Sequence, residues 1–204
     1  MISIIIPIIR PQKAERCIEA IRVNSGLPDG AYEIVTKEDR GRIGCPKMVK
    51  QLTAEACGSL ICFLGDDTVP QENFLKFALQ DMETLPDGWG LIGIDDNIRF
   101  ADTVRAPAHW LADKRLLPYL DGEFFHTGYR HCYCDNELMD RCVALGRYKF
   151  SEQSFVFHDH VISDSANDDS DYRRIYSTDY MMHDMMLYRK RRANNWKGAY
   201  KNGY

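Results

Sequence analysis

Apolar runs alternate with amphipathic stretches along the first half of the chain. The runs are short, rich in β-branched residues and leucine, and followed by polar residues or Pro7, as is typical of strands covered on both faces. The stretches between them have helical spacing, with Gly58 as the expected residue after the second helix. The predicted strands are residues 2–6, 32–36, 59–64 and 89–94, and the predicted helices are residues 14–23, 46–57 and 71–82. This alternation predicts an α/β domain with parallel strands joined by right-handed crossovers.

The second half of the chain is less regular. Asp135 is the expected N-cap of one helix, and a short strand leads to His158 and His160. Residues 163–177 are rich in Asp and Ser and predict a mobile loop. The predicted elements are a strand end with a short helix over 110–120, a helix over 135–145, a strand over 155–157 and a final helix with a basic end over 179–192.

Length and composition then limit the function classes. A chain of 204 residues with 45% hydrophobic residues and no linker predicts one globular domain. Within it the pattern divides the chain into a regular part at 1–100, a less regular part at 101–178, and a basic helix and tail at 179–204. The net charge of −4 disfavours a general nucleic-acid binder.

Two features bear on location. The apolar run at residues 1–9 covers about half a membrane span and has no basic stretch before it, so neither a transmembrane segment nor a signal peptide is expected. The chain has seven scattered cysteines, an odd number, and several of them lie in apolar runs. This usage is typical of a reducing compartment, and we expect a cytoplasmic protein.

Acidic residues follow several of the predicted strands. Because ligands of parallel α/β sheets bind outside the carboxyl ends of the strands, these side chains are expected to meet at one edge. Like charges held together favour a bound cation, and short carboxylates suit a hard divalent ion. For Asp95 and Asp96, an ordinary polar loop explains the residues equally well. The groups at these strand ends are Arg10, Glu38 with Asp39, Asp66 with Asp67, and Asp95 with Asp96.

Two segments carry a family resemblance. Ser3-Ile-Ile-Ile-Pro7 and, after it, Ala56-Cys-Gly-Ser-Leu-Ile-Cys-Phe-Leu-Gly-Asp-Asp-Thr-Val-Pro70 resemble the family-2 glycosyltransferases of the GT-A fold. The resemblance implies a single-domain, Rossmann-like α/β fold with a mostly parallel mixed sheet flanked by helices. It also implies a nucleoside-diphosphate sugar as donor, Mn²⁺ or Mg²⁺ as cofactor, and transfer of a hexosyl or pentosyl group to an acceptor hydroxyl. Residues 1–100 would then form the nucleotide-sugar and metal half, and residues 101–178 the acceptor half.

The resemblance also implies roles for individual residues. Asp67 lies in the segment similar to the metal-chelating DxD motif, with Asp66 beside it, and Gly65 stands where the family often has aspartate. Glu38 or Asp39 would contact the nucleoside, and His158 or His160 would complete the metal site. The residues expected to bind the nucleotide sugar are Pro7, Ile8, Arg10, Glu38, Asp39, Lys47, Lys50 and Asp66.

Cys134-Asp-Asn-Glu-Leu138 resembles the family segment that carries the general base. Asp135 takes the place of that base, and Cys134 departs from the family by replacing an acid. A base at this point implies a single displacement with inversion, because a positioned carboxylate can accept the proton of the attacking hydroxyl. The alternative is that Asp135 only caps a helix.

Other functions compete with this interpretation. A zinc site is disfavoured because Cys132-Tyr-Cys134 lacks the usual spacing. A nucleotidyltransferase is disfavoured because the segment from Pro7 to Pro11 has no glycine, and a nucleotide-sugar-binding module without turnover stays open. The acceptor is unknown: a glycan, a protein or a hydroxylated base in DNA all fit. The basic residues from Arg189 onward are either a solvated helix end or a contact for a polyanion.

Overall fold

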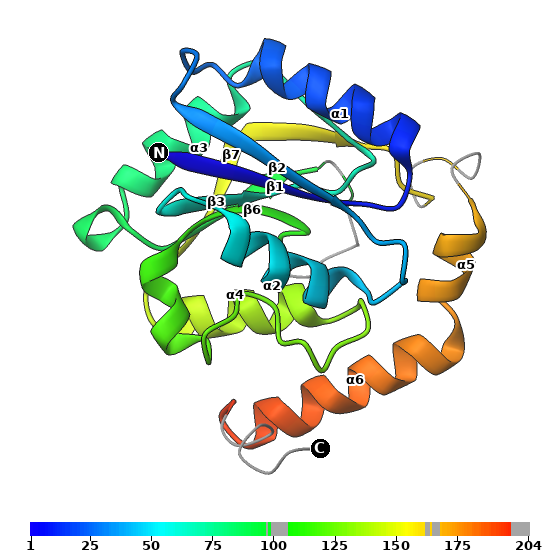
Figure 1. Ribbon diagram of the computed structural model, residues 1–204. Coiled ribbons are helices and arrows are strands. Elements are labelled where there is room, and N and C mark those ends of the chain that lie inside the picture. Colours follow the sequence, from blue (N-terminus) through cyan, green and yellow to red (C-terminus); the bar gives the residue numbers. More distant parts are fainter. Residues whose placement is uncertain (97, 99–105, 162–163, 165–167, 197–204) are drawn as a thin grey trace.

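The computed structural model describes residues 1–96, 98, 106–161, 164 and 168–196 (Figure 1). Its centre is a seven-stranded mixed sheet with strand order β2-β1-β3-β6-β5-β7-β4. β1 is parallel to β2 and β3, and β5 is parallel to β7, whereas β6 is antiparallel to both its neighbours. The strands are β1 (Ile2–Ile8), β2 (Tyr32–Glu38), β3 (Leu60–Phe63), β4 (Thr68–Pro70), β5 (Leu91–Asp95), β6 (His109–Asp113) and β7 (Tyr148–His158).

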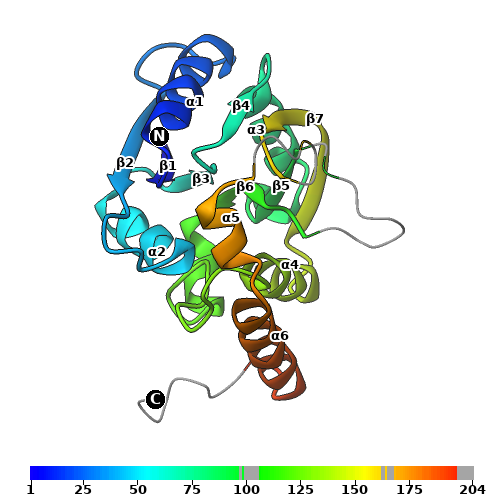
Figure 2. The same cartoon turned by 90° about the vertical axis from the view of Figure 1, so that its right-hand side faces the viewer.

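Helices cover both faces of this sheet (Figures 1 and 2). α1 and α3 pack on one face, α2 and α4 pack on the other, and α6 extends along the end of the molecule beside α4. The α-helices are α1 (Pro11–Asn24), α2 (Cys45–Glu55), α3 (Phe74–Glu83), α4 (Cys134–Ala144), α5 (Ser170–Ile175) and α6 (Thr178–Ala193), and the 3₁₀ helices are η1 (Pro86–Gly88) and η2 (Lys114–Tyr119). Among these described residues, no helix has both the length and the apolar character needed to cross a bilayer.

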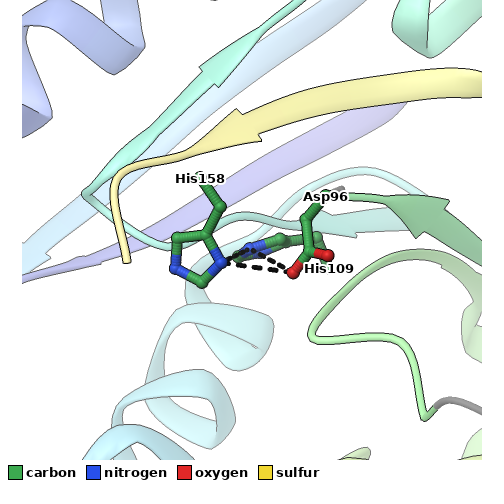
Figure 3. A group of neighbouring side chains, drawn as sticks. All are labelled: Asp96, His109 and His158. Carbon is green, nitrogen blue, oxygen red and sulfur yellow. Dashed lines mark hydrogen bonds and ion pairs between the residues drawn. The ribbon is translucent and has the colours of Figure 1, made fainter. Parts of the chain in front are cut away.

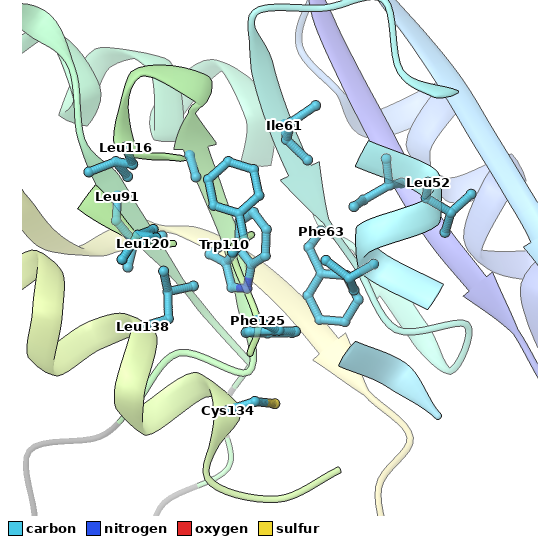
Figure 4. Close-up of a cluster of buried hydrophobic side chains, with 14 of the residues drawn as sticks. Leu52, Ile61, Phe63, Leu91, Trp110, Leu116, Leu120, Phe125, Cys134 and Leu138 are labelled. Carbon is cyan, nitrogen blue, oxygen red and sulfur yellow. The ribbon is translucent and has the colours of Figure 1, made fainter. Parts of the chain in front are cut away.

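The two faces of the sheet explain the apolar pattern of the first strand. Ile5 belongs to the core beneath α2 and α4, while its neighbours Ile4 and Ile6 belong to the core beneath α1 and α3. Alternate residues of a strand point to opposite faces, so a strand buried on both sides is apolar throughout. Trp110 of β6 is fully buried in the first of these cores and packs on Phe63 and Phe125 (Figure 4).

The predicted α/β class and the mixed sheet flanked by helices are confirmed. Each strand and helix predicted in the first half is present, with ends that shift by a few residues. The short strand β4 was not expected. The strand end and short helix predicted over 110–120 are β6 and η2, but the antiparallel direction of β6 and its place between β3 and β5 were not predicted.

Three local predictions are wrong. Pro7 does not end β1, which continues to Ile8; β3 stops opposite Ile5, so Pro7 has a strand partner only in β2 and its missing N–H is tolerated. Gly58 is not the residue after α2, because that helix already ends at Glu55. Gly58 instead lies where the chain passes close to the start of β1, and a Cβ atom at this position would lie 2.7 Å from Oγ of Ser3.

The third error concerns the C-terminal part. The predicted loop at 163–177 contains the helix α5, whose N-cap Asp169 accepts hydrogen bonds from the N–H groups of Asp171 and Tyr172. Within that predicted range, residues 163 and 165–167 lie outside the described residues. The final helix is confirmed as α6.

Candidate functional site

A cavity of about 440 Å³ opens where the first and third strands end. Most of the residues that the sequence predicted for the site line it, from elements that are far apart along the chain. The structure therefore brings the predicted metal, nucleotide and base residues to one place. The predicted residues that line the cavity are Pro7, Arg10, Asp39, Asp66, Asp67, Asp135, His158 and His160.

Asp66 is tied to the protein backbone. Its Oδ2 accepts hydrogen bonds of 2.7 Å from the N–H of Ile9 and 2.6 Å from the N–H of Arg10. Burial and the adjacent charge of Asp67 raise the pKa of Asp66, while the two N–H donors oppose that rise. Asp66 thus fixes the turn from β1 into α1 at the edge of the cavity.

Asp67 has side-chain partners on both of its oxygens. Oδ2 accepts a hydrogen bond of 2.5 Å from the Tyr172 hydroxyl, and Oδ1 lies 3.3 Å from Nε2 of His158. Nη1 of Arg10 is 3.5 Å from Oδ2. Burial alone would raise the pKa of Asp67, but the bonds from His158 and Tyr172 and the charge of Arg10 hold it well below its usual range. Asp67 is therefore an ionised carboxylate in a largely dry site.

His158 is supported from behind by Asp96 and His109 (Figure 3). Nδ1 of His158 lies 3.2 Å from Oδ2 of Asp96 and 3.3 Å from Nε2 of His109. With its proton on Nε2, His158 donates to Oδ1 of Asp67; Nε2 can bind a cation once that proton is lost or lies on Nδ1, on the side of Asp96. A carboxylate behind an imidazole in this way orients the ring of a metal ligand.

His109 is held by the chain segment that carries the aspartates. The N–H of Gly65 donates to Nδ1 of His109 over 3.3 Å, which leaves the ring proton on Nε2, 3.3 Å from Nδ1 of His158 and 3.9 Å from Oδ2 of Asp96. Gly65 is also required sterically, because a Cβ atom there would lie 2.8 Å from Oδ1 of Asp67 and 3.3 Å from Cε1 of His109. Glycine at position 65 thus leaves room for the side chains of Asp67 and His109.

Arg10 links the strand edge to α5. Its Nε donates to Oδ2 of Asp169 over 2.6 Å, and its Cζ lies 4.5 Å from the centre of the Tyr172 ring. Through these contacts α5 forms a wall of the cavity, and Figure 2 shows it in front of β3 and β6. No sequence signal pointed to Tyr172 or Asp169, because their partners are more than a hundred residues away.

Asp135 lies in the first turn of α4 and lines the cavity. The expectation that it caps the helix is wrong: the N-cap is Tyr133, and Oδ1 of Asp135 accepts a hydrogen bond from the N–H of Asn136. The positive end of the helix dipole still favours an ionised side chain here. Cys134 is buried, and its thiol donates to the carbonyl oxygen of His131 over 3.0 Å.

His160 also lines the cavity but has another partner. Its Nε2 and the hydroxyl of Tyr176 are 2.8 Å apart, and burial together with the charge of His158 lowers the pKa of His160 to about 4. Of the two histidines that competed for the metal, His158 is the one whose ring nitrogen is within 4 Å of a carboxylate oxygen of Asp67.

Four predicted nucleotide-binding residues do not line the cavity: Ile8, Glu38, Lys47 and Lys50. Glu38 forms an exposed ion pair with Arg40, and Lys50 pairs with Glu123. Asp39 remains at the cavity, where its oxygens accept the N–H groups of Ile43 and Gly44 and so order the turn into α2.

Comparison with known proteins identifies the fold. No protein-family model matches the chain, and no curated protein matches its sequence. A structure of Staphylococcus aureus TarS 1–349 with UDP superimposes with a TM-score of 0.62 at 13% identity, covering 99% of this chain and 73% of that one. In another TarS structure the chain spans 60% of the length.

Two further structures are similar. The Pyrobaculum calidifontis mannosyltransferase PcManGT, in complex with GDP-Man and Mn²⁺, gives a TM-score of 0.59 at 13% identity, covering 77% of this chain and 56% of that one. A Drosophila β1,4-galactosyltransferase 7 mutant, in complex with manganese, UDP-Gal and xylobiose, gives a TM-score of 0.58 at 12% identity. The match covers 78% of this chain and 70% of that one. These neighbours are GT-A-type glycosyltransferases, and the chain shares their fold.

Proposed function

We propose that this GT-A-fold chain is a metal-dependent glycosyltransferase that moves a sugar from a nucleoside diphosphate to an acceptor hydroxyl. The observation that carries the proposal is the pair Asp67 and His158, whose facing atoms are 3.3 Å apart in the cavity beside β3. Structures with the same fold hold UDP-GlcNAc, GDP-Man with Mn²⁺, or UDP-Gal with manganese. The sugar, hexosyl or pentosyl, is set by contacts that this fold does not fix.

The residues present fit a divalent cation. Two ligands in neighbouring positions around one ion are about 3 Å apart, which matches Oδ1 of Asp67 and Nε2 of His158. An imidazole ligand suits Mn²⁺ better than Mg²⁺, which prefers oxygen. When bound, the ion supplies positive charge that neutralises a diphosphate leaving group.

The chain's own residues would do the rest. Arg10, whose guanidinium is mostly buried at the cavity edge, adds a fixed positive charge for phosphate oxygens. Asp135 would accept the proton of the acceptor hydroxyl while the oxygen of that hydroxyl attacks the anomeric carbon. The bond from that carbon to the diphosphate breaks in the same step, so the configuration inverts. Asp39 and Pro7 form the wall on the side of β1 and β2, where the nucleoside is expected.

A donor-hydrolysis assay with UDP- and GDP-sugars and Mn²⁺ tests the proposal, with Asp67→Asn as the variant. Loss of an ionised carboxylate ligand is expected to lower Mn²⁺-dependent turnover by about a hundredfold or more. Asp87→Asn is the matched control, because Asp87 is exposed and pairs with Arg147 outside the cavity. Mn²⁺-dependent turnover that survives in Asp67→Asn contradicts the assigned site.

A binding module without turnover is distinguished by Asp135→Asn. If the chain is an enzyme, this variant retains the stabilisation by UDP or GDP with Mn²⁺ and loses transfer. If the chain only binds, wild type and variant are equally inactive. A nucleotidyltransferase would release pyrophosphate from a nucleoside triphosphate, and the same samples can be assayed for pyrophosphate.

A cytoplasmic location is proposed because all seven cysteines are free.

A further inference from the structure

A second groove, of about 490 Å³, lies next to the cavity and has no role in the donor chemistry. One stripe of α6 forms its floor, since the α6 residues follow one another at helical spacing along a single face. Tyr133 forms its remaining wall and also lines the first cavity, so the two hollows adjoin at this residue. The groove is lined by Tyr133, Met185, Tyr188, Arg189, Arg192 and Ala193.

Tyr133 is held in a conformation that a bulky residue seldom adopts. Its φ of 64° and ψ of −7° lie in the left-handed region, which costs about 1–2 kcal/mol for a side chain with a Cβ. The preceding loop is clamped from α6: the buried carboxylate of Asp184 accepts the N–H groups of Arg130, His131 and Cys132. Strain of this kind persists only where the surroundings enforce it, and it clusters at ligand sites.

The groove combines aromatic faces with a fixed set of polar groups. The rings of Tyr133 and Tyr188 are 5.4 Å apart and tilted by 32°, which leaves no space for a planar base between them. The Tyr188 hydroxyl donates to Asp140 over 2.6 Å, and Nε of Arg192 lies 3.6 Å from the same carboxylate. Arg189 is exposed at the rim.

We propose that this groove binds a saccharide acceptor and leads it past Tyr133 to Asp135. The inference rests on the proposed function, whose acceptor it specifies. A sugar ring has an apolar C–H face, which packs on an aromatic ring, and a rim of hydroxyls, which bond to carboxylate and guanidinium groups. Tyr133 and Tyr188 supply the aromatic rings, and Arg189 and Arg192 supply the guanidinium donors.

The charges favour a saccharide over a nucleic acid. Nucleic-acid grooves track the phosphates with a row of uncompensated cations. Here Arg192 is shared with Asp140, and the buried Arg191 forms two hydrogen bonds with Glu137. The net charge of the whole chain is −4.

The test uses the full chain on an array of natural oligosaccharides, followed by titration of the retained saccharides and of a short oligothymidylate. Tyr133→Asn removes the ring with a residue that tolerates the left-handed conformation, whereas Tyr133→Phe keeps the ring. Tyr133→Asn and Arg189→Ala are each expected to weaken saccharide binding about tenfold, and Tyr133→Phe is expected to bind like the wild type. Arg22→Ala, at an exposed position in the last turn of α1, is the matched control.

The thermal shift caused by UDP or GDP with Mn²⁺ is recorded on the same samples, so a failed groove is distinguished from a failed donor site. Saccharide binding that Tyr133→Asn and Arg189→Ala weaken and Arg22→Ala preserves supports the inference, whatever the nucleotides do. The inference is overturned if no saccharide is retained, if both variants bind saccharide like the wild type, or if only the oligothymidylate binds.

Discussion

The hydroxyl of Tyr172 donates a hydrogen bond of 2.5 Å to Oδ2 of Asp67 and so joins α5 to the carboxylate that follows β3. Asp67 is the residue that the proposed function assigns to the metal. Its other oxygen faces His158, and Arg10 lies 3.5 Å from Oδ2. A metal ion must therefore compete with donors that the protein itself provides.

Tyr172→Phe is expected to bind Mn²⁺ about tenfold more tightly than the wild type. The substitution keeps the ring against Arg10 but removes the competing hydroxyl, and hydrogen bonds to charged groups contribute about 1.5–3 kcal/mol. Isothermal titration with MnCl₂ measures the change, with the exposed Tyr119→Phe as control. An unchanged or weaker affinity would mean that Tyr172 does not oppose the ion.

Asp184→Asn is expected to destabilise the fold by about 2–3 kcal/mol. The Asp184 side chain is fully buried and accepts N–H groups from the loop that precedes α4. An asparagine presents an NH₂ group to at least one of those donors and leaves it without an acceptor. Urea unfolding measures the loss. Asp179→Asn, at an exposed α6 residue that pairs with Arg130, is expected to lose about 0.5 kcal/mol or less, and equal losses would contradict the clamp.

Stability is expected to fall on acidification through His126. This buried ring accepts the N–H of Gly128 at Nδ1 over 2.7 Å, and burial together with the charge of Arg191 lowers its pKa from 6.5 to about 4. Between these values the unfolded chain binds the proton and the folded chain does not. The contribution is therefore complete above about pH 6.5 and is lost as the pH falls towards about 4, by ~1 kcal/mol at a pH of about 5.5.

Urea unfolding at neutral pH and at a pH of about 5.5 measures this loss of stability. His126→Gln is expected to show the smaller loss of stability between the two conditions. Arg40→Gln, at an exposed position in a pair with Glu38, controls for the substitution. Equal losses in wild type and His126→Gln would rule out His126 as a source of the pH dependence.

Local pattern was sufficient for much of the molecule. The apolar runs predicted the strands of the first half, because a strand buried on both faces must be apolar at every position, as in β1. The rule that ligands meet the carboxyl ends of strands selected Arg10, Asp66 and Asp67 from their positions along the chain, and all three line one cavity. These inferences depend only on residues close together in the chain.

Tertiary structure decided what surrounds those residues. The antiparallel strand β6 enters between β3 and β5 and places His109 beside His158, 49 residues further along the chain. Likewise α5 brings Tyr172 to Asp67 across 105 residues. Spacing along the sequence does not predict such contacts. They arise from the order of the strands in the sheet and from the position of α5 beside the strand ends. The amino-acid pattern alone predicted the strands of the first half and the acidic residues at their ends; only the fold set the full strand order and selected the side chains that complete the site.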